Sequence, residues 1–317
     1  MNILITGASG FVGGSFMRWA SRNPSVCVHG IGRRRLQMAN YTSWDLTKPL
    51  EIEQTPDVVI HAAARSAPWG SLEEFRRQNV TATENVVDFC VRKRVKHLIY
   101  ISSSSVFYRE ADQEGMTEET PIGPDFVNHY ARTKYEGELA ARKFPGRVVV
   151  LRPRAVFGEG DTVLFPRILA AARAGRMYRF LREGPPVKGD LIHIGSLCDY
   201  MLRAALDPAV EGDFNLTNDA PVEIEPFLCG VFQRLGIPLP DKTMSSEKAL
   251  KLATAIEWVY KIIMPYKEPP ITRFGIGVLA YSKTFDASKT LRVLGPPAVT
   301  LEDGVEAFVR WQKQQMR

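Results

Sequence analysis

The first thirteen residues constrain the fold more tightly than the rest of the chain. An apolar run, Ile3-Leu4-Ile5, leads into a glycine-rich turn, and a helical pattern follows. Glycines at intervals of three let the backbone turn sharply from strand to helix and let the two elements pack closely. A helix that begins there presents free N–H groups and the positive end of its dipole to an anion. The sequence therefore predicts a turn that binds the pyrophosphate of a dinucleotide, through Gly7, Ser9, Gly10, Phe11, Val12 and Gly13.

Short β-branched runs alternate with longer helical patterns through the first half of the chain. This alternation is typical of βαβ units around a parallel sheet, and the regularity fades after about residue 158. We expect an α/β fold, a doubly wound parallel sheet with a smaller C-terminal α/β cap. The dinucleotide-binding domain is expected to span residues 1–155 with about 187–206 returning to it, and the cap about 156–186 and 207–317. Strands are expected at 2–6, 26–31, 57–62, 97–102 and 147–151, and helices at 11–22, 72–93, 128–143, 245–264 and 301–314.

The composition excludes several classes of protein. With 317 residues, 45% of them apolar and 24% charged, the chain suits one large globular domain or two modest ones, and not a disordered or coiled-coil protein. The net charge of +6 is too small for a nucleic-acid-binding footprint and fits an anionic small ligand. Four widely spaced cysteines without a CxxC pair favour reduced thiols over a disulfide framework or a metal site.

The chain carries no sign of a membrane span or a secretion signal. No run reaches the roughly 18 apolar residues of a span, and the glycine turn interrupts the segment that a signal peptide would keep apolar. We expect a cytoplasmic protein with a small-molecule substrate, no nucleic-acid partner and no integral membrane segment. An apolar stripe around residues 249–264 leaves a peripheral membrane contact open, and a homodimer is open as well.

The end of the second expected strand indicates which dinucleotide binds. An NAD-preferring site usually has an acidic residue about 20 positions after the glycine turn, whereas Arg accommodates the 2′-phosphate of NADP. Gly32 stands 19 residues after Gly13 (32 − 13), and Arg33 and Arg34 follow it without an acid. The alternative is a solvated basic loop, which is what most charge runs are. The sequence favours NADP(H) and leaves NAD(H) open.

Tyr130 and Lys134 stand four residues apart in a helical pattern and therefore share a helix face. An ammonium about 5 Å from a phenol favours the phenolate by about 3 kcal/mol at an effective dielectric of about 20. Such a tyrosine can exchange a proton with an alcohol or ketone oxygen as hydride moves. The structural alternative is that Lys134 is a solvated helix residue.

Serine residues 102–105 end an apolar strand, at the edge where open α/β sheets bind ligands. A hydroxyl there can stabilise charge on a substrate oxygen, and serines at a strand end can also simply form a loop. His61 and His193, both near strand ends or in apolar runs, are interpreted as packing or backbone-bonding residues. No spacing of His, Cys or Asp indicates a metal.

Together these features resemble the extended short-chain dehydrogenase/reductase family over nearly the whole chain. The shared motifs are Thr6-Gly7-x-x-Gly10-x-x-Gly13, Asp45-Leu46, His61-Ala62-Ala63-Ala64, Asn79-Val80 before Asn85-Val86, the serine strand end, Tyr130-x-x-x-Lys134 and Arg152-Pro153. The resemblance implies a Rossmann-type fold, Tyr130 as acid/base, and Lys134 holding the nicotinamide ribose and lowering the pKa of Tyr130. It implies Ser103 as the catalytic hydroxyl, four residues before Phe107, but the family usually has Tyr at 107, so Ser104 stays open. The further cofactor-binding residues that it implies are Asp45 at the adenine, Leu46, Ala62, Ala63, Ala64, Asn79, Tyr130, Lys134 and Pro153.

Within the family, the second half resembles the branch of 3β-hydroxysteroid dehydrogenases and β-keto acid reductases, on residues 152–161, 268–274 and 285–289. Nucleotide-sugar epimerases and dehydratases usually carry Asn where Ala155 stands. The resemblance implies an NADP(H)-dependent oxidoreductase that interconverts a secondary alcohol and a ketone on an apolar substrate, steroid-like or β-keto/hydroxy acyl. The apolar residues between 250 and 285 favour the same substrate class. The alternatives are a nucleotide-sugar epimerase or dehydratase and a non-catalytic NADP-binding sensor.

Overall fold

The computed structural model describes residues 1–264 and 266–316 of the chain. A parallel sheet of seven strands forms its centre, in the order β3-β2-β1-β4-β5-β7-β12. The chain builds outward from β1 to β3 and then returns to the other side of β1 for β4 and the strands beyond it. Ligands of open α/β sheets bind at such a reversal, outside the carboxyl ends of the strands. The strands are β1 (Asn2–Thr6), β2 (Cys27–Gly32), β3 (Tyr41–Ser43), β4 (Val58–His61), β5 (His97–Ile101), β7 (Arg147–Pro153) and β12 (Gly212–Leu216).

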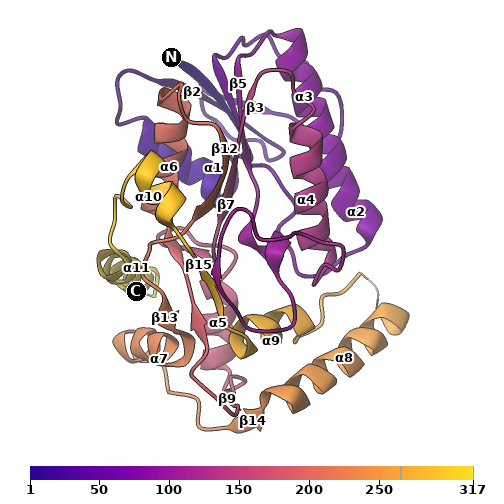
Figure 1. Ribbon diagram of the computed structural model, residues 1–317, viewed down its shortest axis with the longest axis vertical. Helices are drawn as coiled ribbons and strands as arrows, with labels where there is room; N and C mark the ends of the chain where they lie inside the picture. Colours follow the sequence, from indigo (N-terminus) through magenta and orange to yellow (C-terminus); the bar gives the residue numbers. More distant parts are fainter. Residues whose placement is uncertain (265, 317) are drawn as a thin grey trace.

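Helices cover both faces of this sheet (Figure 1). Alternate residues of a strand face opposite sides, so Ile3 and Ile5 belong to the core beneath one helical layer and Leu4 to the core beneath the other. Strands that are buried on both faces become apolar throughout, which is why these strands appear as continuous apolar runs. One layer holds α1 (Phe11–Ala20), α6 (Ile194–Leu206) and α10 (Ser288–Leu294). The other holds α2 (Leu72–Arg76), a π-helical turn (Arg77–Thr81), α3 (Ala82–Arg92) and α4 (His129–Ala141).

The expected fold class is confirmed, and the structure corrects two local expectations. The helix predicted over 72–93 is α2, the π-helical turn and α3 in succession. The residues from 207 onward were assigned to the cap, but β12 pairs with β7 and is an edge strand of the main sheet. Conversely, β6 (Gln113–Met116) and β10 (Lys188–Gly189), expected in the dinucleotide-binding domain, belong to a second sheet. Asp213 and Asn215 break the apolar alternation of β12, because Asp213 pairs with Arg142 and Arg152 at that edge. The helix α6, which follows β11, had no counterpart in the sequence prediction.

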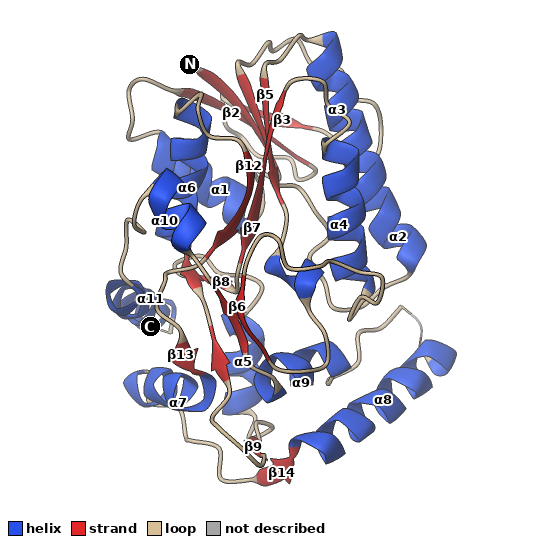
Figure 2. Ribbon diagram, viewed as in Figure 1, coloured by secondary structure: helices blue, strands red, loops and turns tan. Residues whose placement is uncertain are grey.

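A cap lies beyond the carboxyl edge of the main sheet (Figure 2). Its four-stranded sheet, β13-β10-β15-β6, brings together segments from both halves of the chain, and the pairs β11-β8 and β14-β9 complete it. Its core is rich in phenylalanine, from Phe157 and Phe165 to Phe308. The strands are β6 (Gln113–Met116), β8 (Val156–Phe157), β9 (Arg179–Leu181), β10 (Lys188–Gly189), β11 (Ile192–His193), β13 (Val222–Glu223), β14 (Thr243–Ser245) and β15 (Lys283–Phe285). The helices are α5 (Phe165–Arg173), α7 (Ile224–Arg234), α8 (Ser246–Ile263), α9 (Arg273–Ala280) and α11 (Leu301–Gln315).

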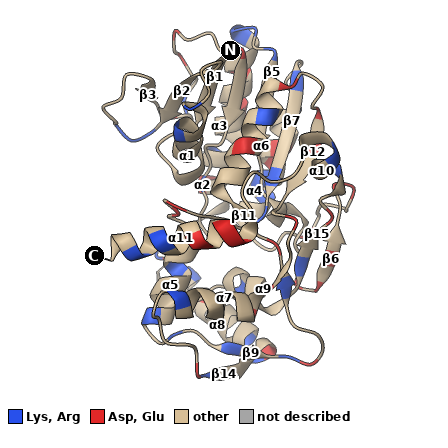
Figure 3. Ribbon diagram, turned by 90° about the vertical axis from the view of Figure 1, so that its left-hand side faces the viewer, with Lys and Arg blue, Asp and Glu red and all other residues tan. Residues whose placement is uncertain are grey.

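Charged residues of both signs are interspersed on the side of the molecule drawn in Figure 3. On α11, Glu302 and Asp303 stand in the first turn and Lys313 in the last, which suits the helix dipole. Within the described part of the chain, none of the helices combines the length and the apolar character that a membrane crossing requires.

Candidate active site

The glycine turn after β1 has the geometry of an anion-binding site. Gly7 has a φ of +72°, and a Cβ there would lie 2.8 Å from the backbone N of Ala63. A Cβ on Gly13 would lie 2.4 Å from the carbonyl O of Gly7, so helix and turn pack without room for side chains. Gly10 is the N-cap of α1 and provides no side-chain cap, so the first N–H groups of the helix are left for a ligand. The turn therefore fits a pyrophosphate, with three further partly exposed residues around it: Ser9, Phe11 and Val12.

The end of β2 has no room for an acidic side chain. A Cβ on Gly32 would lie 2.6 Å from Oγ of Ser9 and 2.8 Å from the hydroxyl of Tyr41. The side chains of Arg33 and Arg34 are exposed, and the loop backbone that carries them is held by hydroxyl groups of β3. Tyr41 donates a hydrogen bond to the carbonyl O of Arg34 at 2.6 Å, and Ser43 one to that of Arg33 at 3.1 Å. The end of β2 thus carries the exposed cations Arg33 and Arg34 and has no room for a carboxylate at position 32.

Asp45 and Leu46 follow β3. Despite some burial, hydrogen bonds from Thr47 and the charges of Arg33 and Lys48 hold the pKa of Asp45 below its usual range. Leu46 is buried. Asp45 is therefore close enough to Arg33, at the end of β2, to interact with its charge.

The loop after β4, which contains Ala62, Ala63 and Ala64, is fixed by a buried asparagine. Asn79 Oδ1 accepts the backbone N–H of Arg65 at 2.7 Å, and its Nδ2 donates to the hydroxyl of Thr133 on α4 at 3.0 Å. Asn79 is 1% exposed and lies in the π-helical turn. These two hydrogen bonds connect the loop after β4 to α4 and fix the position of the loop.

The two histidines have structural roles, as expected. His61 is fully buried between the hydroxyls of Thr6 (2.7 Å) and Thr83 (3.0 Å), and burial lowers its pKa to about 3. His193 caps α6, because its Nδ1 accepts the backbone N–H of Gly195 at 3.2 Å. The other ring nitrogen of His193, Nε2, lies 3.0 Å from the carboxylate of Glu159, so both nitrogens of each imidazole are engaged within the protein.

Tyr130, Ser103 and Lys134 come together at the carboxyl edge of the main sheet. The hydroxyl of Tyr130 lies near those of Ser103, after β5, and Ser66, after β4, close enough for both to act on its pKa. Burial raises the pKa of Tyr130, and the interaction with these two hydroxyl groups offsets part of the increase. Ser66 was missed by the sequence analysis, although its place just after a strand end marks it as a residue of this edge.

Lys134 is 2% exposed, so it is not a solvated helix residue. Its Nζ donates to the carbonyl O of Ile101 at 2.6 Å and lies 4.2 Å from the ring centroid of Tyr100. Burial lowers the pKa of Lys134 to about 7, and Glu138 acts in the opposite direction. The expectation that Lys134 lowers the pKa of Tyr130 is not met in the protein alone, because burial dominates both groups. At neutral pH, Tyr130 is therefore protonated.

The candidate serines differ in their surroundings. Ser103 is partly exposed and its Oγ lies 2.9 Å from that of Ser105. Ser104 is 2% exposed and its Oγ is 3.1 Å from the hydroxyl of Tyr108. Of the two, Ser103 is the one that reaches Tyr130.

A network of buried charged residues lies next to Ser103 and Lys134 at the carboxyl edge of the main sheet. Glu138 of α4 accepts hydrogen bonds from the hydroxyl of Ser102 (2.5 Å) and from the Nε and Nη2 of Arg152 (2.9 and 2.7 Å). Arg152 also binds Asp213 of β12 at 2.7 Å. Pro153, another expected cofactor residue, ends β7 directly after Arg152 and is buried. The network joins α4, β5, β7 and β12 next to the catalytic candidates.

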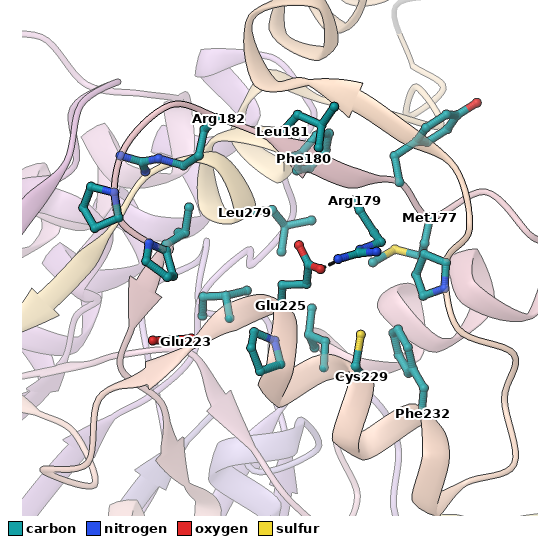
Figure 4. A pocket seen from close by; sticks show the side chains of 18 of the residues that line it. Met177, Arg179, Phe180, Leu181, Arg182, Glu223, Glu225, Cys229, Phe232 and Leu279 are labelled. Carbon is teal, nitrogen blue, oxygen red and sulfur yellow. Dashed lines mark hydrogen bonds and ion pairs between the residues drawn. The ribbon is translucent and has the colours of Figure 1, made fainter.

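A cavity of about 360 Å³ opens in the cap between β9 and α7 (Figure 4). Its walls are largely apolar, and an ion pair between Arg179 and Glu225 (2.6 Å) crosses it. None of the candidate catalytic residues lines it. Of the apolar residues between 250 and 285, Leu279 reaches this cavity, whereas Trp258 and Tyr266 are 64% and 95% exposed.

Comparisons with known proteins agree with this geometry. The model of the NAD dependent epimerase/dehydratase family matches residues 3–217. The chain is 30% identical to a 2-alkyl-3-oxoalkanoate reductase of Stenotrophomonas maltophilia, over 96% of this chain and 97% of the relative. It is 28% identical to a decarboxylating sterol-4-alpha-carboxylate 3-dehydrogenase of Candida albicans, over 99% and 98% of the two chains. The crystal structure of a UDP-glucuronic acid 4-epimerase from Bacillus cereus superposes with a TM-score of 0.73, 20% identity and complete coverage of both chains, which shows the shared fold.

The fold, the glycine turn and the Tyr130–Lys134 helix thus define an NAD(P)-dependent enzyme of the extended short-chain dehydrogenase/reductase type. The chain belongs to the NAD dependent epimerase/dehydratase family.

Proposed function

We propose that the protein is an NADP(H)-dependent oxidoreductase that interconverts a secondary alcohol and a ketone on an apolar substrate. The observation that carries the proposal is that the hydroxyl groups of Tyr130 and Ser103 converge at the carboxyl edge of the sheet, where Tyr130 shares a helix with the buried Lys134. Two hydroxyl groups that converge on one place can both donate to a single carbonyl oxygen.

In this mechanism the protein residues handle the proton. Because burial raises its pKa, Tyr130 holds its proton at neutral pH and can donate it to a ketone oxygen. Ser103 donates a hydrogen bond to the same oxygen and stabilises the charge that develops there. Lys134, anchored on the carbonyl O of Ile101, holds the nicotinamide ribose. A bound NADP(H) supplies or accepts the hydride.

The preference for NADP(H) is proposed from the end of β2. Gly32 leaves no room for a carboxylate that would bind the ribose 2′-hydroxyl. Arg33 and Arg34 are exposed there, and guanidinium groups match the geometry of a phosphate. The remaining cofactor contacts are proposed for the glycine turn, Asp45 and Leu46, the three alanines after β4, Asn79 and Pro153. We also propose that residues 1–155 without β6, together with α6, α10 and β12, form the cofactor domain.

The apolar substrate is proposed from the names of the relatives and from the cap. The two relatives described above are named for an oxoalkanoate and a sterol. The cavity walls in the cap are largely apolar, and burial of apolar surface contributes roughly 25 cal/mol per Å². The alternative function is that of a nucleotide-sugar epimerase, and the fold shared with the 4-epimerase supports it. Against it, Ala155 stands where such enzymes usually carry Asn, so this position offers no side-chain amide to a sugar.

A turnover panel tests this proposal. With NADPH present, the rates on long-chain ketones, 3-oxo compounds and 3-ketosteroids are compared with the rates on UDP-, GDP- and dTDP-sugars. We expect turnover with the lipophilic carbonyl compounds, followed as NADPH oxidation. Turnover confined to a nucleotide sugar contradicts the proposal and supports the epimerase. Binding of NADPH without turnover of any compound supports the sensor.

A further inference from the structure

A second group of buried charged residues lies beside the catalytic edge, and the mechanism above does not use it. Arg154, which follows β7, and Lys283 of β15 are 5% and 2% exposed. Both cations lie against the ring of Tyr108: the guanidinium carbon of Arg154 is 5.2 Å from its centroid and Nζ of Lys283 5.7 Å. Tyr108 in turn shares a hydrogen bond with Ser104 and is close enough to Tyr130 to raise its pKa. The two cations are thus one side chain away from the proposed proton donor.

The positive charge of this group is not balanced within the described part of the chain. The guanidinium of Arg154 lies over the ring of Tyr108, its buried Nε has no hydrogen-bond partner, and no acidic group of residues 1–264 and 266–316 lies within ion-pair distance of it. The charge of Asp190 acts on Arg154 from farther away. One oxygen of Asp190 accepts the backbone N–H of Phe285 at 2.8 Å, and burial raises the pKa of this carboxyl to about 6.

Lys283 is also without a carboxylate of its own. Its Nζ donates to the backbone carbonyl groups of Ala111 and Ser282. Asp112, whose charge reaches Lys283, is already paired with Arg182 at 2.7 Å. Burial and the charge of Arg154 lower the pKa of Lys283 to about 8. Buried charges are costly unless they are paired, so an anion seated between Arg154 and Lys283 would stabilise both.

We propose that Arg154 and Lys283 form a carboxylate-binding subsite beside Tyr130, which selects a 3-hydroxy or 3-oxo acid over its neutral analogues. The proposal rests on the oxidoreductase function proposed above. In such an acid only one carbon separates the carboxylate from the reacting carbon, so one molecule can engage both the two cations and Tyr130. A guanidinium matches a carboxylate in two parallel hydrogen bonds.

The surroundings of the subsite suit the part of such a molecule that lies next to the cations. A groove beside Tyr108 and Lys283 is lined by Val127 and by Phe274 and Val278 of α9. The groove is small, about 20 Å³, and Arg109, Glu110 and Arg273 also line it, so it offers apolar contact to the part of the molecule next to the cations and leaves the rest of an alkyl chain outside it. With Asp190 ionised, the group carries one net positive charge, which a single carboxylate neutralises.

The test compares three alcohols that share an alkyl chain: 3-hydroxydecanoate, its methyl ester, and 2-nonanol. Their kcat/KM values are measured with saturating NADP⁺ in wild type, Arg154→Gln and Lys283→Met. We expect wild type to prefer the acid by about 10- to 100-fold, the range of a charged hydrogen bond. Each variant should lose this preference through a higher KM for the acid, while its kcat/KM for the ester stays within about threefold of wild type. Arg273→Gln is the matched control, because Arg273 lines the same groove but is paired with Glu110, and it should keep the preference.

A binding measurement separates this inference from the proposed function. Decanoate has no hydroxyl to react, and with NADP⁺ present it should raise the melting temperature of wild type but not of Arg154→Gln or Lys283→Met. If wild type oxidises all three alcohols equally and decanoate does not stabilise it, the carboxylate subsite is overturned and the proposed oxidoreductase function still stands. Wild type that oxidises none of them but still shows the decanoate effect overturns the function alone. Variants that lose the acid and the ester to the same extent show that the two cations are structural, which also overturns the inference.

Discussion

The change Glu138→Gln removes a negative charge from the interior while keeping the shape of the side chain. Glu138 is fully buried and accepts hydrogen bonds from Arg152 and Ser102. Removing one partner of a buried ion pair typically costs about 3–5 kcal/mol. Arg152 keeps Asp213 as a second partner at 2.7 Å, so we expect the free energy of unfolding to fall by about 2–3 kcal/mol.

The same change should alter the pH dependence of catalysis. Glu138 raises the pKa of Lys134, which burial lowers to about 7. Without the carboxylate, Lys134 loses its proton at a lower pH. Because a charged Lys134 supports the proposed site, the fall of kcat/KM on the alkaline side should begin at lower pH in Glu138→Gln than in wild type.

Glu136→Gln is the matched control, two residues earlier on the same helix. Glu136 pairs with Arg76 and Arg132, and all three side chains are partly or largely exposed. Exposed ion pairs contribute about 0–1 kcal/mol, so this variant should lose less than about 1 kcal/mol. Urea unfolding followed by circular dichroism measures both losses, and initial rates across pH give the profiles. Equal losses in the two variants, or an unchanged pH profile in Glu138→Gln, would refute the reasoning.

Three further predictions concern the cofactor and acid stability. Replacing Arg33 and Arg34 by Ala should lower kcat/KM with NADPH by about 10-fold or more and leave the value with NADH nearly unchanged; a parallel loss with both cofactors contradicts this. Gly7→Ala, whose Cβ would lie within 2.9 Å of neighbouring backbone at a φ of +72°, should destabilise the protein by about 2–4 kcal/mol in urea unfolding. Gly230→Ala, with nothing within 4 Å of the added Cβ, should be neutral or stabilise by up to about 1 kcal/mol, and similar losses in the two glycine variants refute the argument. Because burial lowers the pKa of His61 to about 3, the unfolded chain binds a proton below about pH 6.5 that the folded protein does not, and stability should fall by about 2 kcal/mol as the pH is lowered from 7 to 5. The melting temperature of His61→Gln should fall less over that range, and an equal fall contradicts the assignment.

The parts of the fold that depend on local signals could be predicted from the sequence. The bounds of β1 match the expected 2–6, because a strand buried on both faces is apolar from end to end. The glycine turn was predictable for a similar reason, since Gly7 needs a positive φ that other residues avoid. The spacing of Tyr130 and Lys134 placed both on one helix, which the structure shows as α4.

The parts that depend on tertiary contacts could not be predicted. The polar Asp213 and Asn215 concealed β12, and the arginine partners of Asp213 come from elements far away in the sequence. The burial of Tyr130, which raises its pKa instead of lowering it, and the burial of Lys134 against β5 both follow from packing and not from helix spacing. Arg154 and Lys283 approach the same ring only because the cap sheet brings β15 beside the end of β7.

The most direct test of the account is the rate of Tyr130→Phe. The change removes the proposed proton donor and keeps the aromatic ring, so packing and cofactor binding should survive. We expect kcat on a reactive ketone or secondary alcohol to fall by about 10²–10⁴-fold, while the Kd for NADPH, measured by fluorescence titration, stays within about threefold of wild type. Near-full turnover by Tyr130→Phe would contradict the assignment of Tyr130 as the acid/base and, with it, the proposed mechanism.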